Sequence, residues 1–174
     1  MMLVSKQLRF LLDALNNLGG AREDQLAALL LPAFCSKRPD VAPIVTSAAL
    51  KQAYTYNRPF EWEDGLVYLR GRRPEPLFLE AVDVMLELTD GAPLSYHPLT
   101  PPLLLRFAIQ EQKIRLFCVT EPNPDMVGFQ KTERIIQLFD GQGQARALPV
   151  SNKQFYAVKQ EDGSHRFFAF DGGL

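Results

Sequence analysis

The segment that most constrains the fold of this chain is a β-hairpin pattern over residues 58–70. Its sequence is Arg-Pro-Phe-Glu-Trp-Glu-Asp-Gly-Leu-Val-Tyr-Leu-Arg. Apolar and polar residues alternate from Phe60 to Trp62, and Gly65 provides a turn signal because glycine tolerates positive φ. Residues 66–69 then return as a second strand. The pattern predicts two antiparallel strands joined by a tight turn.

Two helical segments open the chain. Leucines recur at helical spacing over residues 5–18, and the glycine pair that follows is typical of a helix C-terminus. Residues 21–31 predict a second helix, with two acidic residues in its first turn, where the helix dipole favours them. Pro32 is expected to close this helix.

A third helix is expected after a connection over residues 33–45. Thr46 or Ser47 can cap it, and the pattern runs to about Tyr56. Three short helices followed by a hairpin are the outline of a winged helix, a fold that usually binds DNA or mediates protein contacts. We therefore predict a winged-helix domain over residues 1–73, with the third helix in the recognition position.

Basic and polar side chains on the third helix and around the hairpin are the candidate nucleic-acid contacts. Lysine and arginine neutralise phosphates, and glutamine can read a base edge. The candidates are Lys51, Gln52, Arg58, Arg70, Arg72 and Arg73, with Tyr56 beside them on the third helix. Because this helix carries little charge, we expect contact with the phosphate backbone of duplex DNA rather than reading of a specific sequence.

The same fold can instead bind protein. Tyr54, Tyr56, Phe60 and Trp62 would then form an apolar contact patch, and the arginines after the hairpin would be a solvated linker. A contiguous positive surface across the third helix and the hairpin would favour DNA. Exposed aromatic residues around a neutral patch would favour a protein partner.

Charge divides the chain near the Arg-, Gly- and Pro-rich segment at residues 70–76. Residues 1–73 contain ten Lys/Arg and seven Asp/Glu, a net charge of +3. Residues 74–174 contain nine Lys/Arg and thirteen Asp/Glu, a net charge of −4. A mildly basic first half and an acidic second half fit a DNA-contacting module joined to a second domain.

The second half predicts one helix followed by strands. The helix covers residues 77–88 and ends at Asp90 and Gly91, and residues 91–102 are expected to be a loop. About five strands follow, at residues 103–109, 114–120, 134–139, 154–159 and 165–170, with a short helix possible at 142–148. This order predicts a small mixed α+β domain over residues 74–174.

Few residues suggest catalysis. The two histidines, His97 and His165, do not lie beside a cysteine or at helix-pair spacing, so we expect no zinc site and no cofactor. Cys35 and Cys118 are expected to be reduced thiols of a cytoplasmic protein, and Cys118 to pack in the core. No apolar run approaches the roughly 18 residues that a membrane helix needs, so we expect no membrane partner. The start of the chain has no signal-peptide cleavage site.

One group of residues resembles the active site of a metal-dependent nuclease. Glu111 and Lys113 have the Glu-x-Lys spacing of restriction-nuclease sites, in which carboxylates hold Mg²⁺ and the lysine stabilises developing charge. Asp83 or Asp90 could supply the upstream carboxylate. Glu111 and Lys113 fall at a hairpin tip, however, where composition favours an exposed polar turn. A nuclease is therefore an alternative that requires these side chains to converge.

The order of elements resembles a known family. The winged-helix outline, the strand at residues 134–139 and a terminal hairpin from 155–158 to 167–170 are similar to small winged-helix proteins of Gram-positive gut bacteria. Those proteins are distantly similar to the replication-relaxation family of plasmids and mobile elements. The resemblance covers most of the chain, in element order, and implies a nuclease-like second domain linked to plasmid replication or transfer.

The second domain would be degenerate and non-catalytic, because Glu111 and Lys113 lie at a turn rather than on a central strand. The expected function is a non-enzymatic, cytoplasmic, DNA-associated protein of a bacterial plasmid or mobile element. Its second domain would bind a protein partner or self-associate. A protein-interaction module and a metal-dependent nuclease remain the alternatives.

Overall fold

The structure, a computed structural model, describes residues 4–125, 128–139, 141 and 144–170. Within these residues the fold is mixed α+β, with four α-helices, a three-stranded sheet and a six-stranded sheet. None of the described helices combines the length and the apolar character needed to cross a membrane.

The first half orders its elements as helix, strand, helix, helix, strand, strand. The bounds are α1 Lys6–Leu18, β1 Gly20–Arg22, α2 Glu23–Phe34, a 3₁₀ turn Pro39–Val41, α3 Ala42–Asn57, β2 Glu61–Glu63 and β3 Leu66–Tyr68. β3 pairs antiparallel with both β1 and β2. The Ser5 hydroxyl caps α1 by accepting a hydrogen bond from the Leu8 amide, and Gly19 at φ 83° ends it.

Two helix boundaries differ from the sequence prediction, both at prolines. Pro32 does not close α2, which continues to Phe34. A proline this close to a helix end removes only one backbone hydrogen bond, so the last turn survives. α3 begins at Ala42 rather than at a cap near Thr46, and Pro43 lies in its first turn. Proline is favoured there because its missing N–H has no partner to lose.

The second half contains α4 and the larger sheet. The bounds are α4 Pro76–Thr89, β4 Ser95–Pro98, β5 Leu103–Gln110, β6 Ile114–Thr120, β7 Arg134–Phe139, β8 Gln154–Lys159 and β9 His165–Ala169. The strands lie in sequence order across the sheet. β7 is parallel to both β6 and β8, and the other pairs are antiparallel.

The second half therefore has six described strands rather than about five. The added strand, β4, falls in the segment expected to be a loop, and β1 in the first half was not predicted either. Such strands of three or four residues depend on partners distant in the sequence, which a local pattern does not reveal. Residues 144–148 are not helical, and Gln142 and Gly143 of the predicted short helix lie outside the described residues.

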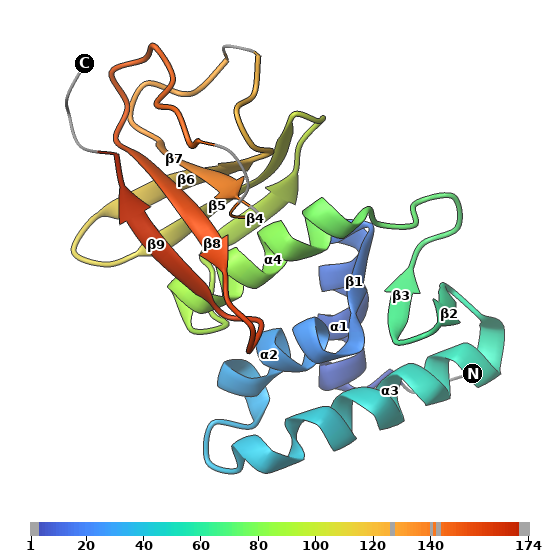
Figure 1. The fold of residues 1–174 in the computed structure, drawn as a ribbon. Helices are drawn as coiled ribbons and strands as arrows, with labels where there is room; N and C mark the ends of the chain where they lie inside the picture. The colour runs from blue at the N-terminus through green and yellow to red at the C-terminus, as the bar shows by residue number, and fades with distance from the viewer. Residues whose placement is uncertain (1–3, 126–127, 140, 142–143, 171–174) are drawn as a thin grey trace.

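α4 lies between the six-stranded sheet and α2 (Figure 1). It is apolar on two sides, as expected for a helix packed between two layers. Its fully buried residues are Ala81, Val82, Val84 and Met85. One continuous buried cluster contains Leu15 and Leu30 from the first half and Phe107 and Ile136 from the sheet. The segments on either side of residues 70–76 thus contribute to the same core.

A glycine fixes the close approach between the two halves. Asp90 and Gly91 end α4 with φ angles of 50° and 77°, as their sequence suggests. A Cβ atom at Gly91 would lie only 2.4 Å from the backbone oxygen of Ala28 in α2. Pro32 leaves that oxygen without its usual helical N–H donor. The chain therefore packs against α2 at the point where proline interrupts the hydrogen bonding of the helix.

Candidate nucleic-acid interface

One side of α3 is exposed over most of its length. Pro43 and Asn57 are exposed at its two ends, and the exposed residues between them, which we call the α3 face, are Ile44, Ser47, Ala48, Lys51, Gln52, Thr55 and Tyr56. They recur at spacings of three and four, so they form one stripe. The opposite side, including Ala49, Leu50 and Ala53, is buried in the core. The predicted contacts Lys51 and Gln52 therefore point away from the protein, and Lys51 is the one charged residue of the α3 face.

Arg58 places a second cation at the C-terminal end of α3. Its backbone is left-handed, with φ 46°, which ends the helix. Its guanidinium donates a hydrogen bond to the Tyr54 hydroxyl and lies 4.7 Å from the centroid of the Tyr54 ring. The hydrogen bond to Tyr54 raises the pKa of Arg58. Arg58 is thus a permanent positive charge between α3 and the β2–β3 hairpin.

Carboxylates of the hairpin engage two of the predicted arginines. The Arg70 Nε atom lies 3.6 Å from Glu61 Oε1. Arg73 forms an ion pair with Glu63, whose carboxylate also accepts a 2.7 Å hydrogen bond from the Tyr68 hydroxyl. Both arginines and both carboxylates are exposed, and exposed ion pairs contribute at most about 1 kcal/mol. Either arginine can therefore exchange its carboxylate for a phosphate at low cost.

Arg72 is exposed to solvent but rests against the backbone rather than on a carboxylate. A Cβ atom at Gly19 would lie 2.7 Å from Arg72 Cζ, so the guanidinium covers the end of α1. The structure thus brings Lys51, Gln52 and Arg58 together on and beside α3. Arg70, Arg72 and Arg73 follow β3, with the carboxylates of β2 interleaved among them.

The four aromatic residues of the protein-contact alternative do not share one exposed patch. Phe60 is buried, and Tyr54 and Trp62 are half-buried. The Tyr54 and Trp62 rings meet edge to face with centroids 5.7 Å apart. Of the four, Tyr56 is clearly exposed, at 58%. The cluster mainly packs the hairpin against α3.

The nuclease constellation is not assembled. Glu111 and Lys113 lie at the tip of the β5–β6 hairpin. Asp83 faces the first half, where it pairs with Arg22, and Asp90 ends α4. No group of three His, Cys, Asp or Glu residues in the described part of the chain could hold a metal ion.

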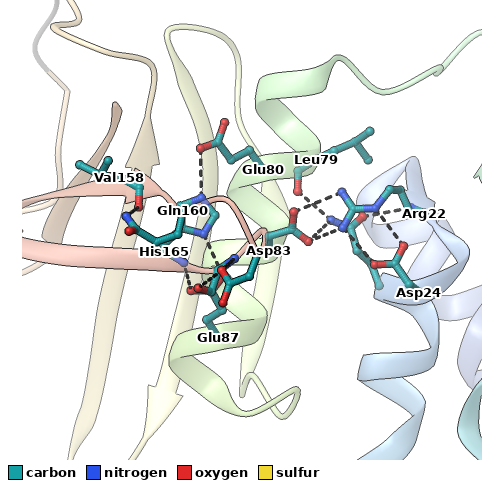
Figure 2. A network of polar contacts seen from close by, with 12 residues as sticks. Arg22, Asp24, Leu79, Glu80, Asp83, Glu87, Val158, Gln160 and His165 are labelled. Atoms are coloured by element: carbon teal, nitrogen blue, oxygen red, sulfur yellow. Dashed lines mark hydrogen bonds and ion pairs between the residues drawn. The ribbon is translucent and has the colours of Figure 1, made fainter. Parts of the chain in front are cut away.

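The sequence did not reveal a polar network that connects the first half to α4 (Figure 2). The Asp83 carboxylate accepts hydrogen bonds from Arg22 at 2.6 Å and from Gln25 at 2.8 Å. Gln25 also donates to the Leu79 carbonyl at 2.7 Å. Hydrogen bonds to Asp24 and then to Asp83 raise the pKa of Arg22 despite its partial burial. The network fixes the orientation of α4 relative to β1 and α2.

His165 forms a second link, between α4 and the β8–β9 hairpin. Its ring is fully buried, with Nδ1 2.8 Å from Glu87 Oε1 and Nε2 3.0 Å from Glu80 Oε1 (Figure 2). Burial alone would lower the pKa of His165, but the hydrogen bonds to Glu80 and Glu87 outweigh it and raise that pKa. With both ring nitrogens facing carboxylates, the imidazole fits this site best when protonated.

Because of the His165 site, we expect the folded protein to lose stability as the pH rises. Because the pKa of His165 is higher in the folded chain than in the unfolded chain, its stabilisation is complete below the ordinary value of about 6.5 and is lost as the pH passes the raised value. Urea denaturation at pH 6 and pH 9 should show lower stability at pH 9. In His165→Gln the decrease should be smaller, and an equal decrease in both proteins would contradict the assignment.

The cysteines match their sequence interpretation as thiols. Cys35 and Cys118 are both free and buried. Burial raises the pKa of the Cys118 thiol to about 12, so it is protonated and unreactive near neutral pH. The prediction that Cys118 packs in the core is confirmed.

In comparisons with known proteins, no family model, no curated protein and no solved structure matches this chain.

Proposed function

We propose that the first half is a winged helix that contacts duplex DNA, and that the chain is a non-enzymatic DNA-associated protein. The α3 face carries this proposal. It is exposed over most of the helix and lies beside a hairpin whose two ends hold Arg58 and Arg70. The α3 helix follows two other helices and precedes that hairpin, which is the order expected of a recognition helix.

The charge pattern supports contact with phosphates more than reading of bases. Lys51 and Arg58 would neutralise phosphates along α3, and Arg70, Arg72 and Arg73 would do so along the hairpin. Gln52 is the one uncharged residue among the predicted contacts, and its amide suits the edge of an adenine. Binding should therefore be weakly selective for sequence and strongly dependent on salt. The similarity in element order to the replication-relaxation family suggests that the protein is encoded by a bacterial plasmid or mobile element.

A double substitution on α3 tests the proposal. Lys51→Ala/Arg58→Ala should weaken binding to a random-sequence duplex by about tenfold at 50 mM salt, because two phosphate contacts are lost. Fluorescence anisotropy with a labelled duplex of about 20 base pairs measures the affinity. The matched control is Lys37→Ala/Lys159→Ala, which removes two exposed charges elsewhere. Equal affinities in the two variants would refute contact through α3.

A protein partner is the second candidate for the α3 face. Ile44 is 68% exposed and Tyr56 is 58% exposed, and both belong to this face. Large exposed apolar side chains on one helix face favour a protein contact. The two functions depend on different residues. DNA contact requires Lys51 and Arg58, whereas contact with a protein partner requires Ile44 and Tyr56. If the partner is a second copy of this chain, self-association measured by sedimentation should be lost in Ile44→Ser/Tyr56→Ser.

A further inference from the structure

A basic pocket lies on the second half, formed by residues that the sequence does not group together. It has a volume of about 550 Å³, within the range of small-molecule sites. Three segments line it, residues 113–116, 131–134 and 151–153. β6, β7 and β8 are parallel and begin at the same edge of the sheet, so the segments at their amino ends meet there.

The pocket is positively charged, whereas the half of the chain that contains it has a net negative charge. Residues 74–174 carry nine Lys/Arg and thirteen Asp/Glu. Five of those nine cations line the one pocket, namely Lys113, Arg115, Lys131, Arg134 and Lys153. Like charges repel one another, so this concentration is costly unless an anion compensates it.

The one carboxylate in the lining cannot provide that compensation. Glu133 has no exposed surface, and its two oxygens accept hydrogen bonds from Arg106 Nε at 2.7 Å and Arg106 Nη2 at 2.9 Å. It also accepts from the Gln130 amide at 2.9 Å. The hydrogen bond to Glu133 raises the pKa of Arg106. Glu133 and Arg106 therefore form a neutral pair beneath the pocket.

Several donors of the pocket have no acceptor within residues 4–125, 128–139, 141 and 144–170. Lys131 and Lys153 are exposed and form no ion pair among the described residues. Arg115 contacts Glu111 at 3.3 Å, yet its Nε atom is buried and has no hydrogen-bond partner in the described part of the chain. Asn152 shapes the site by donating to the Gln130 and Glu133 carbonyls at 2.8 and 2.7 Å.

An apolar edge lies beside these cations. Ile114 is 58% exposed, and together with Leu116 it lines the pocket. Thr132 and Ser151 add hydroxyl groups to the lining. Bare phosphate would use the cations and hydroxyls but not the apolar edge. A phosphate joined to a nucleoside matches both, because the base and sugar can bury apolar surface against Ile114 and Leu116.

We propose that this pocket binds a nucleoside phosphate, either as a free nucleotide or as one unit of a single strand. The cations hold the phosphate groups, and Ile114 and Leu116 contact the nucleoside. The site lies wholly within residues 113–153, whereas the proposed duplex contacts lie within residues 51–73. The proposal therefore does not depend on DNA binding by the first half.

Two probes distinguish the sources of the phosphate. ATP binding is measured by titration calorimetry and binding of a fluorescein-labelled ten-nucleotide DNA strand by anisotropy, both at 50 mM salt. Lys131→Ala/Lys153→Ala should weaken binding of at least one probe by about tenfold. Lys37→Ala/Lys159→Ala, with the same loss of charge outside the pocket, should stay within about twofold of the unaltered protein.

The results with the two probes distinguish a free nucleotide from a nucleic-acid strand. Loss of ATP affinity in the pocket variant assigns a free nucleotide, and loss for the strand alone assigns a nucleic acid. Absence of binding to either probe, or an equal loss in the pocket and control variants, overturns the proposal. Pyrophosphate binding as tight as ATP binding overturns the nucleoside contact at Ile114 and Leu116. Because the four substituted lysines are exposed, thermal unfolding should show that both variants fold.

Discussion

Replacing Glu133 with glutamine is expected to lower the free energy of unfolding by about 3–5 kcal/mol. Glu133 is fully buried, and the Arg106 side chain that it binds is 14% exposed. Glutamine keeps an oxygen that can accept from the Gln130 amide, but it leaves the Arg106 cation buried without a counter-charge. Urea denaturation at pH 7 measures the difference.

A double variant separates the cost of an unpaired charge from the value of the pair itself. Arg106→Met/Glu133→Leu replaces both ions with apolar side chains, which is often neutral for a buried pair. It should therefore be more stable than Glu133→Gln alone. A Glu133→Gln variant that loses less than about 1 kcal/mol would show that water or another group compensates Arg106.

Replacing Gly91 with alanine should destabilise the protein by roughly 3 kcal/mol. Two costs combine at this position. The φ angle of 77° is unfavourable for a residue with a Cβ atom, at about 1–2 kcal/mol. The Cβ atom would also lie 2.4 Å from the Ala28 oxygen, a backbone atom that moves only if α2 shifts away from α4.

Gly163 provides the matched control for Gly91. Its φ angle is 87°, and a Cβ atom there would meet no atom of the described residues within 4 Å. Gly163→Ala should therefore show the conformational cost alone, about 1–2 kcal/mol. Equal losses in the two variants, measured by urea denaturation, would mean that the contact between Gly91 and α2 contributes nothing.

Local patterns predicted most of the regular elements. The leucine stripe and Gly19 identified α1, and the turn at Gly65 identified the β2–β3 hairpin. These signals succeed because each depends on neighbours within a few residues. The expected end of α2 at Pro32 was wrong because that boundary depends on distant neighbours. The helix ends where tertiary packing stops supporting it, not at the first proline.

The candidate site could be predicted only in part. Exposure of Lys51 and Gln52 follows from the helical period of α3, because the apolar residues Leu50 and Ala53 fix the buried side. The pairing of Arg70 with Glu61 could not be predicted, because Arg70 follows the end of β3 and its exposed side chain is not held by the strand register. The basic pocket could not be predicted from the sequence, because its three segments meet only through the parallel arrangement of β6, β7 and β8.

The proposed function is binding of duplex DNA by the first half, through phosphate contacts at α3 and the hairpin. Its most direct test is the slope of log affinity against log salt concentration for a random duplex, with and without Arg70→Ala/Arg72→Ala/Arg73→Ala. Each phosphate contact contributes about 0.9 to that slope, so the triple variant should flatten it by about three. A slope that the triple substitution leaves unchanged would contradict phosphate contact at the hairpin, and an affinity that does not respond to salt would contradict phosphate contact by the first half as a whole.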